Sequence, residues 1–135
     1  MNILIINGPN LNLLGTREPE IYGTQTMSDC LDQLEKEFPS VGFHYYQSNI
    51  EGEIINKLQE HNFDALIINP GAYTHYSYAI ADALKSVKAP KIEVHISNLY
   101  QREEFRQKSV TAANTNGILS GFGMAGYRLA VLSLL

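Results

Sequence analysis

Two pairs of side chains in this sequence have the types and the spacing for acid–base chemistry. Arg17 and Tyr22 are the first pair, within NGPNLNLLGTREPEIYG, residues 7–23, a long segment with no helical or strand period. A phenol titrates near ~10, and a neighbouring guanidinium lowers that pKa because it favours the phenolate. The pair therefore indicates a tyrosine base. Two simpler roles stay open, since Arg17 could pair with Glu18 or Glu20 and Tyr22 could anchor the loop by packing.

Glu93 and His95 form the second pair. They are two residues apart in IEVHI, residues 92–96, so alternation along a strand places both side chains on the same side. A carboxylate beside a histidine orients the ring and raises its pKa, which suits a general acid. The alternative is a buried histidine satisfied by the backbone. A buried Glu–His pair is costly unless it is used, so we favour a catalytic role.

Two polar side chains and the backbone N–H groups of two loops could bind a ligand. Asn10 follows Pro9 at the end of the first predicted strand, where its amide could hydrogen-bond a ligand or a reaction intermediate, although asparagine is also common in turns. His75 closes the polar loop NPGAYTH, residues 69–75, which opens a predicted helix. Backbone N–H groups there, and after Ile96, could hold an anion.

Arg102 and Arg106 are four residues apart, so one helical turn would place them on the same face. They either form a solvated surface with Glu103 and Glu104, or close over a small acidic, hydroxylated substrate. The sequence does not decide between these two roles.

Metal, serine-hydrolase and nucleotide sites are poorly supported. No His-x-x-x-His or Cys-x-x-Cys spacing exists, and His75 and His95 lack a third convergent ligand. No G-x-S-x-G motif is present. No Walker or G-x-G-x-x-G pattern follows the first strand, and the match at residues 121–126 has no following strand or acidic partner. We therefore expect no metal and no cofactor.

Composition sets the broad class. A length of 135 residues favours one domain, residues 1–135, and a net charge of −4 argues against a general nucleic-acid binder. The single cysteine, Cys30, cannot form an intramolecular disulfide and lies in a helical pattern, which indicates a packed thiol in a reducing compartment. No signal peptide is apparent, and no stretch approaches the ~18 apolar residues of a membrane span. We expect a cytoplasmic protein without membrane contact.

Apolar strands and amphipathic helices alternate along the chain. The pattern predicts strands over residues 3–6, 41–47, 64–69, 91–96 and 117–122, helices over 26–38, 50–61, 76–87 and 123–135, and a helical turn around 102–106. Strands that are apolar on both faces are typical of a parallel sheet covered on two sides. The sequence thus predicts a flavodoxin-like α/β sandwich with strand order 2-1-3-4-5. The segments after strands 1, 3 and 4 should meet, because ligands bind at the carboxyl ends of such strands.

Together these segments closely resemble the type II 3-dehydroquinate dehydratase, or type II dehydroquinase, family. The matching motifs are collinear and span nearly the whole chain: NGPNLNLLGTREPEIYG, QSNIEGEII, NPGAYTH, IEVHISN, REEFR and GFGMAGY. The resemblance implies a flavodoxin-like parallel sheet, in agreement with the strand pattern. It also implies dehydration of 3-dehydroquinate to 3-dehydroshikimate by anti elimination through an enolate, without cofactor, metal or Schiff base. Whether this serves aromatic amino acid biosynthesis through the shikimate pathway or quinate catabolism stays open.

The resemblance implies a catalytic role for five residues. Tyr22 is the base, and Arg17 keeps its pKa low. Asn10 steadies the enolate through a water molecule. His95 is the general acid that protonates the leaving hydroxyl, and Glu93 orients His95.

The resemblance also implies a set of residues that bind the substrate: Asn69, Gly71, His75, Asp82, Ile96, Ser97, Arg102 and Arg106. Asn69 and the backbone N–H groups of Ile96 and Ser97 are expected to hold the carboxylate. His75 and Arg106 are expected to bind the ring hydroxyls.

The resemblance also implies a mobile lid and a contact with a neighbouring subunit. Arg102 is expected to belong to a mobile lid together with Arg17 and Tyr22. Asp82 is expected to reach the site of a neighbouring subunit, because the family assembles as trimers that form a dodecamer.

Two other functions remain open from the residues alone. The first is a non-enzymatic flavodoxin-like domain that holds a small anion or a nucleotide, against which the lack of a phosphate loop after the first strand speaks. The second is a different lyase or isomerase on the same scaffold. A Schiff-base dehydratase would need a lysine in a desolvated site, and all six lysines lie in polar or element-end contexts.

Overall fold

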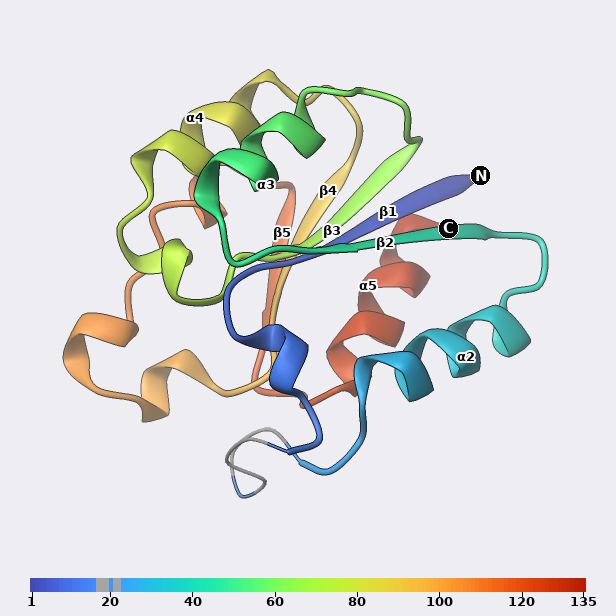
Figure 1. Ribbon diagram of the computed structural model, residues 1–135, viewed down its shortest axis with the longest axis horizontal. Helices are drawn as coiled ribbons and strands as arrows, with labels where there is room; N and C mark the ends of the chain where they lie inside the picture. The colour runs from blue at the N-terminus through green and yellow to red at the C-terminus, as the bar shows by residue number, and fades with distance from the viewer. Residues whose placement is uncertain (17–19, 21–22) are drawn as a thin grey trace.

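A five-stranded parallel sheet lies at the centre of the molecule (Figure 1). The computed structural model describes residues 1–16, 20 and 23–135. Its strands are β1 (Asn2–Asn7), β2 (Gly42–Gln47), β3 (Ala65–Asn69), β4 (Lys91–His95) and β5 (Gly117–Ser120). They lie in the order β2-β1-β3-β4-β5, and every neighbouring pair is parallel. The predicted flavodoxin-like order is confirmed.

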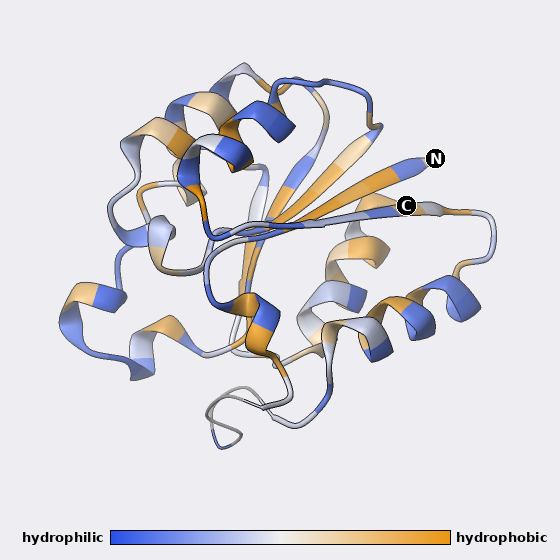
Figure 2. Cartoon of the chain, viewed as in Figure 1, coloured by the Kyte–Doolittle hydropathy of each residue, from blue (hydrophilic) through white to orange (hydrophobic). Residues whose placement is uncertain are grey.

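Helices cover both faces of the sheet. Helices α2 (Met27–Glu37) and α5 (Ala125–Leu134) lie on one face, and α3 (Glu51–Leu58) and α4 (Tyr78–Ser86) lie on the other (Figure 1). Alternate residues of β1 enter different cores, with Ile5 packing in the core of α2 and α5 and Leu4 in that of α3 and α4. Figure 2 shows that β1 and β3 are strongly hydrophobic and that hydrophilic and hydrophobic residues alternate along α2. Burial on both faces explains why β1 and β3 are apolar without alternation.

Helix α2 begins with a capping box directly after the segment that contains Arg17 and Tyr22. The hydroxyl of Thr26 accepts from the backbone N–H of Asp29 at 3.1 Å, and the Asp29 carboxylate accepts from the N–H of Thr26 at 3.3 Å. These two bonds satisfy donors that the first helical turn leaves unpaired. Thr26 is therefore the N-cap, and the start of α2 is fixed.

The helical turn predicted around residues 102–106 is present in shorter form as the 3₁₀ helix η4 (Glu104–Arg106), and a second 3₁₀ helix, η3 (Leu99–Gln101), precedes it. They are separate because Arg102 and Glu103 have extended backbone, with ψ of 178° and 151°. Further 3₁₀ turns are η1 (Leu11–Leu13), inside the segment predicted to lack regular structure, η2 (Gly71–His75) and η5 (Ala112–Asn114). The turns η1 to η4 follow β1, β3 and β4 at the carboxyl edge of the sheet, whereas η5 precedes β5.

Candidate active site

The loops after β1 and β3 cross each other in direct contact. Asn7 and Asn69 are register partners at the ends of these strands, and the N–H of Gly8 donates to the carbonyl of Asn69 at 2.8 Å. A Cβ atom at Gly8 would lie 2.3 Å from the carbonyl oxygen of Pro70, so only glycine fits. This close approach brings residues far apart in the sequence to one edge of the sheet.

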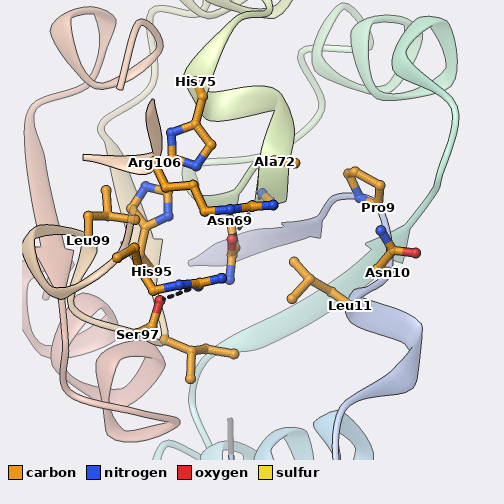
Figure 3. Close-up of a pocket in the computed structure, with 13 residues that line it drawn as sticks. Pro9, Asn10, Leu11, Asn69, Ala72, His75, His95, Ser97, Leu99 and Arg106 are labelled. Carbon is orange, nitrogen blue, oxygen red and sulfur yellow. Dashed lines mark hydrogen bonds between the residues drawn. The ribbon is translucent and has the colours of Figure 1, made fainter. Parts of the chain in front are cut away.

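A pocket lies at this edge, over the carboxyl ends of β1, β3 and β4 (Figure 3). The expected meeting of the three segments is confirmed. The pocket is lined by Pro9, Asn10, Leu11, Asn69, Gly71, Ala72, His75, His95, Ile96, Ser97, Leu99, Arg102 and Arg106. It combines two histidines, two arginines and several amide groups, a set suited to an anionic, hydroxylated molecule.

Glu93 and His95 share one side of β4, as predicted. The Nε2 atom of His95 lies 2.7 Å from Oε2 of Glu93, and both side chains are buried. Because an ionised carboxylate only accepts hydrogen bonds, Nε2 carries a proton in this contact. Nδ1 is then the ring nitrogen that can exchange a proton with a molecule in the pocket. The arrangement orients His95 for acid chemistry.

Three hydroxyl groups complete the surroundings of Glu93. Ser109 and Thr74 donate to Oε2 at 2.8 and 3.1 Å, and Thr111 donates to Oε1. Burial acts to raise the pKa of Glu93, but the hydrogen bonds and charge of His95, with the bonds from Thr111 and Ser109, outweigh it and hold this pKa below its ordinary value. Glu93 is therefore ionised at neutral pH, and its negative charge faces His95.

The cationic wall of the pocket comes from Arg102, which lies between η3 and η4, and from Arg106 in η4. Nη1 of Arg102 donates to the hydroxyl of Ser97 at 3.1 Å (Figure 3). Nε of Arg106 lies 2.8 Å from Oε2 of Glu103, and its guanidinium lies over the ring of Phe105. Although no single helix joins them, both arginines line the same pocket.

His75 lines the same pocket as His95 and Arg106 (Figure 3). Its Nδ1 atom lies 2.7 Å from the carbonyl oxygen of Lys108, which only accepts, so Nδ1 carries the proton. Partial burial lowers the pKa of His75, and the nearby charges of His95, Arg106 and Arg102 lower it further. The neutral ring presents Nε2 as an acceptor, which fits a hydroxyl group.

Asn69 is buried at the base of the pocket. Its Oδ1 atom accepts from the N–H of Gly71 at 3.1 Å, and its Nδ2 atom donates to the hydroxyl of Tyr127 at 3.1 Å. Gly71 has φ of +61°, and a Cβ there would meet the carbonyl oxygen of Pro9 at 3.1 Å. The turn thus depends on glycine, and it sets the amide plane of Asn69.

The remaining predicted residues divide into three groups. Asn10 lies at the rim of the pocket opposite His95 (Figure 3), with its N–H bonded to the side chain of Asn49. Asp82 is exposed on α4 and does not line this pocket. Arg17 and Tyr22 lie outside the described residues.

Some residues of the site were not predicted. The four pocket residues missed are apolar: Pro9, Leu11, Ala72 and Leu99. The hydroxyls of Ser109 and Thr111 were missed because nothing in their spacing links them to Glu93, although Thr74 lies inside a motif already singled out. Cys30 is a packed thiol as expected, and its burial raises its pKa to about 11.

Metal-binding clusters and membrane-spanning helices are both absent from residues 1–16, 20 and 23–135. In these residues, no group of three or more His, Cys, Asp or Glu side chains is placed to hold a metal ion. No helix there is both long and apolar enough to cross a membrane.

Known proteins similar to this chain share both its sequence and its fold. The family model described as Dehydroquinase class II matches residues 1–135. The 3-dehydroquinate dehydratase of Clostridium botulinum is 52% identical over 96% of this chain and 91% of its own length, and that of Caldicellulosiruptor bescii is 55% identical over 98% and 94%. The crystal structure of the type II dehydroquinase of Butyrivibrio crossotus superimposes with a TM-score of 0.95 at 51% identity, covering 99% of this chain and 97% of that one.

Proposed function

The chain belongs to the class II dehydroquinase family, and from this premise we propose that it dehydrates 3-dehydroquinate to 3-dehydroshikimate by acid–base elimination. The observation that carries the mechanism is the buried Glu93–His95 pair, which opens onto a pocket lined by Asn69, His75 and Arg106. The reaction breaks a C–H bond next to a ketone and a C–O bond on the adjacent carbon. It needs two proton transfers and no change of oxidation state.

His95 is the general acid in this proposal. It gives a proton to the hydroxyl that leaves as water, and Glu93 stabilises the imidazolium form before the transfer. The 2.7 Å contact and the low pKa of Glu93 support this role, because a charged carboxylate is what holds a proton on the ring. The same contact fixes which ring nitrogen faces the substrate.

Tyr22 is the proposed base, with Arg17 beside it. Both lie outside the described residues, so their roles depend on the matching motif and on the physical requirement for a phenolate. A phenol titrates near ~10, and a guanidinium in contact makes the phenolate accessible at neutral pH. The base takes the proton next to the ketone, and the resulting enolate is steadied by Asn10.

We assign each polar group of the substrate to the pocket residues that offer it suitable hydrogen-bond donors or acceptors. We assign the carboxylate to Asn69 and to the backbone N–H groups of Ile96 and Ser97. The ring hydroxyls go to His75 and Arg106, since neutral His75 offers an acceptor and Arg106 offers donors.

Three further assignments complete the substrate site. Gly71 supplies the turn beneath Asn69. Arg102 closes the site as part of the lid with Arg17 and Tyr22. Asp82 completes a neighbouring subunit's site within a homo-oligomer, which we propose to be a dodecamer. Its exposure on α4, away from the chain's own pocket, supports that assignment.

A direct assay tests the activity. Purified protein treated with a chelator is mixed with 3-dehydroquinate, and the ultraviolet absorbance of the conjugated enone is followed. We expect turnover without added metal or cofactor. Absence of turnover would instead favour the alternative, a domain that binds small anions, and calorimetric titration with 3-dehydroquinate would then show binding without reaction.

Substitution of the proposed base tests the mechanism. Tyr22→Phe is expected to lower kcat by at least ~100-fold, the size of a lost general base, while substrate binding changes little. Tyr78→Phe is the matched control, because Tyr78 is exposed on α4 and away from the pocket. If Tyr22→Phe kept more than a tenth of the wild-type kcat, another group would be the base.

A further inference from the structure

A chain of hydrogen bonds, the two central ones buried, runs behind Asn69, away from the pocket. The N–H of Gly71 donates to Asn69 at 3.1 Å, and Asn69 donates to the Tyr127 hydroxyl at 3.1 Å. The Tyr127 hydroxyl donates to Oδ1 of Asn7 at 2.7 Å, and Nδ2 of Asn7 donates to the Tyr45 hydroxyl at 3.2 Å. The chain thus links β3, α5, β1 and β2 in one line. Asn7 and Tyr127 have no exposed surface.

The N–H of Gly71 determines the donor and acceptor of every bond in this series of hydrogen bonds. A backbone N–H can only donate, so the atom of Asn69 facing Gly71 must be the oxygen. The amide nitrogen of Asn69 therefore faces Tyr127, whose oxygen must accept. Tyr127 then has its own proton left to give, and the oxygen of Asn7 receives it. No amide in the chain can be turned over without breaking a buried bond.

The ionisation state of Tyr127 keeps this direction constant. Complete burial is the main reason that the pKa of Tyr127 lies far above that of a free phenol, despite the opposing hydrogen bonds of Asn69 and Asn7. The hydroxyl keeps its proton over the whole working range of pH. Its proton points at Asn7, and its lone pair stays available to Asn69.

We propose that Tyr127, supported by Asn7, is a positioning residue for substrate binding through Asn69. The terminal torsion of an asparagine is broad, so a single hydrogen bond leaves the amide free to rotate. Gly71 and Tyr127 hold the amide of Asn69 at two points, and the second N–H bond of Nδ2 remains for the substrate. The site therefore offers a fixed donor, which suits a carboxylate. This inference depends on the carboxylate assignment made above.

Removal of the Tyr127 hydroxyl tests this proposal. Tyr127→Phe is expected to raise KM for 3-dehydroquinate by about tenfold, the size of one hydrogen bond, with kcat within about threefold of wild type. The dissociation constant of the product, which keeps the carboxylate, should rise by a similar factor in calorimetry. Tyr45→Phe is the matched control, since it removes the far end of the chain without touching Asn69, and its KM should change less than twofold.

A second variant separates positioning from stability. Tyr127→Phe leaves Asn7 without a donor, so the protein will also unfold at a lower temperature. In the double variant Asn7→Leu/Tyr127→Phe both polar groups are gone, and the melting temperature should recover relative to the single variant while KM stays raised. If KM returned to the wild-type value together with the melting temperature, the role would be purely structural and the proposal wrong. A wild-type protein without activity on 3-dehydroquinate would refute the proposed function instead.

Discussion

Glu93 shows how a buried charge is kept at the site. Its carboxylate has no exposed surface, yet His95, Thr74, Ser109 and Thr111 all donate to its two oxygens. An isolated ionised carboxylate in such a place would take up a proton, because burial disfavours its charged form. Here the donors reverse that preference. The negative charge beside His95 is thus stabilised by hydroxyl groups that do not line the pocket.

This arrangement predicts a particular dependence of stability on pH. Because the pKa of Glu93 is lower in the folded protein than in the unfolded chain, its contribution is fully present above the ordinary glutamate value near ~4.3. It is lost as the pH falls through the folded pKa. The free energy of unfolding of wild type should therefore decrease below about pH 4.3, and Glu93→Gln should flatten that decrease.

Urea unfolding at a series of pH values from 7 to 3 measures this effect. Glu35→Gln is the matched control, since Glu35 is exposed on α2. It should follow the wild-type curve. A Glu93→Gln curve parallel to that of wild type would show that another group controls stability in acid.

At the scale of elements, the crossing of the loops after β1 and β3 decides the geometry of the pocket. Gly8→Ala would place a Cβ 2.3 Å from the carbonyl oxygen of Pro70, and neither backbone can move without disturbing Asn69. We expect a loss of about 1–3 kcal/mol in the free energy of unfolding, as for other overpacked sites, and a raised KM.

Gly52→Ala provides the contrasting glycine. A Cβ at Gly52 meets nothing within 4 Å, and Gly52 lies in α3. The same substitution there should stabilise the protein by about 0.5–1 kcal/mol, because alanine is the better helix former. Chemical denaturation of both variants checks the pair. Equal effects at the two positions would show that the loop crossing is not strictly packed.

How far the sequence predicts each element depends on its periodicity. The strands and the Glu93–His95 contact were predictable because burial on both faces and the two-residue period leave clear patterns. The turn at residues 102–106 was predicted only in outline, since spacing alone does not show that it is a 3₁₀ helix limited to residues 104–106. Thr111 and Tyr127 were missed for a related reason. Their partners Glu93 and Asn69 lie 18 and 58 residues away, and only the sheet order brings them together.

At the scale of the whole molecule, the charge of the pocket is opposite in sign to the net charge of the chain. The chain carries a net charge of −4, yet Arg102 and Arg106 both line the pocket. An anionic substrate is therefore attracted locally by a protein that would repel it on average. The net charge of −4 disfavours general binding of polyanions such as nucleic acids.

Exposed aromatic side chains on and beside α4 indicate that copies of this chain assemble through this face. Tyr78 and the neighbouring Tyr76 are 70% and 59% exposed, and Tyr78 shares its helix face with Asp82, four residues on. Large apolar groups gathered on a surface usually mark a contact with another protein. Light scattering should give a mass about twelve times the 15.1 kDa of one chain. Tyr78→Ser should shift the protein to smaller species, whereas Leu132→Ser on α5 should not. A wild type that ran as a monomer would contradict the proposed assembly, and with it the role of Asp82.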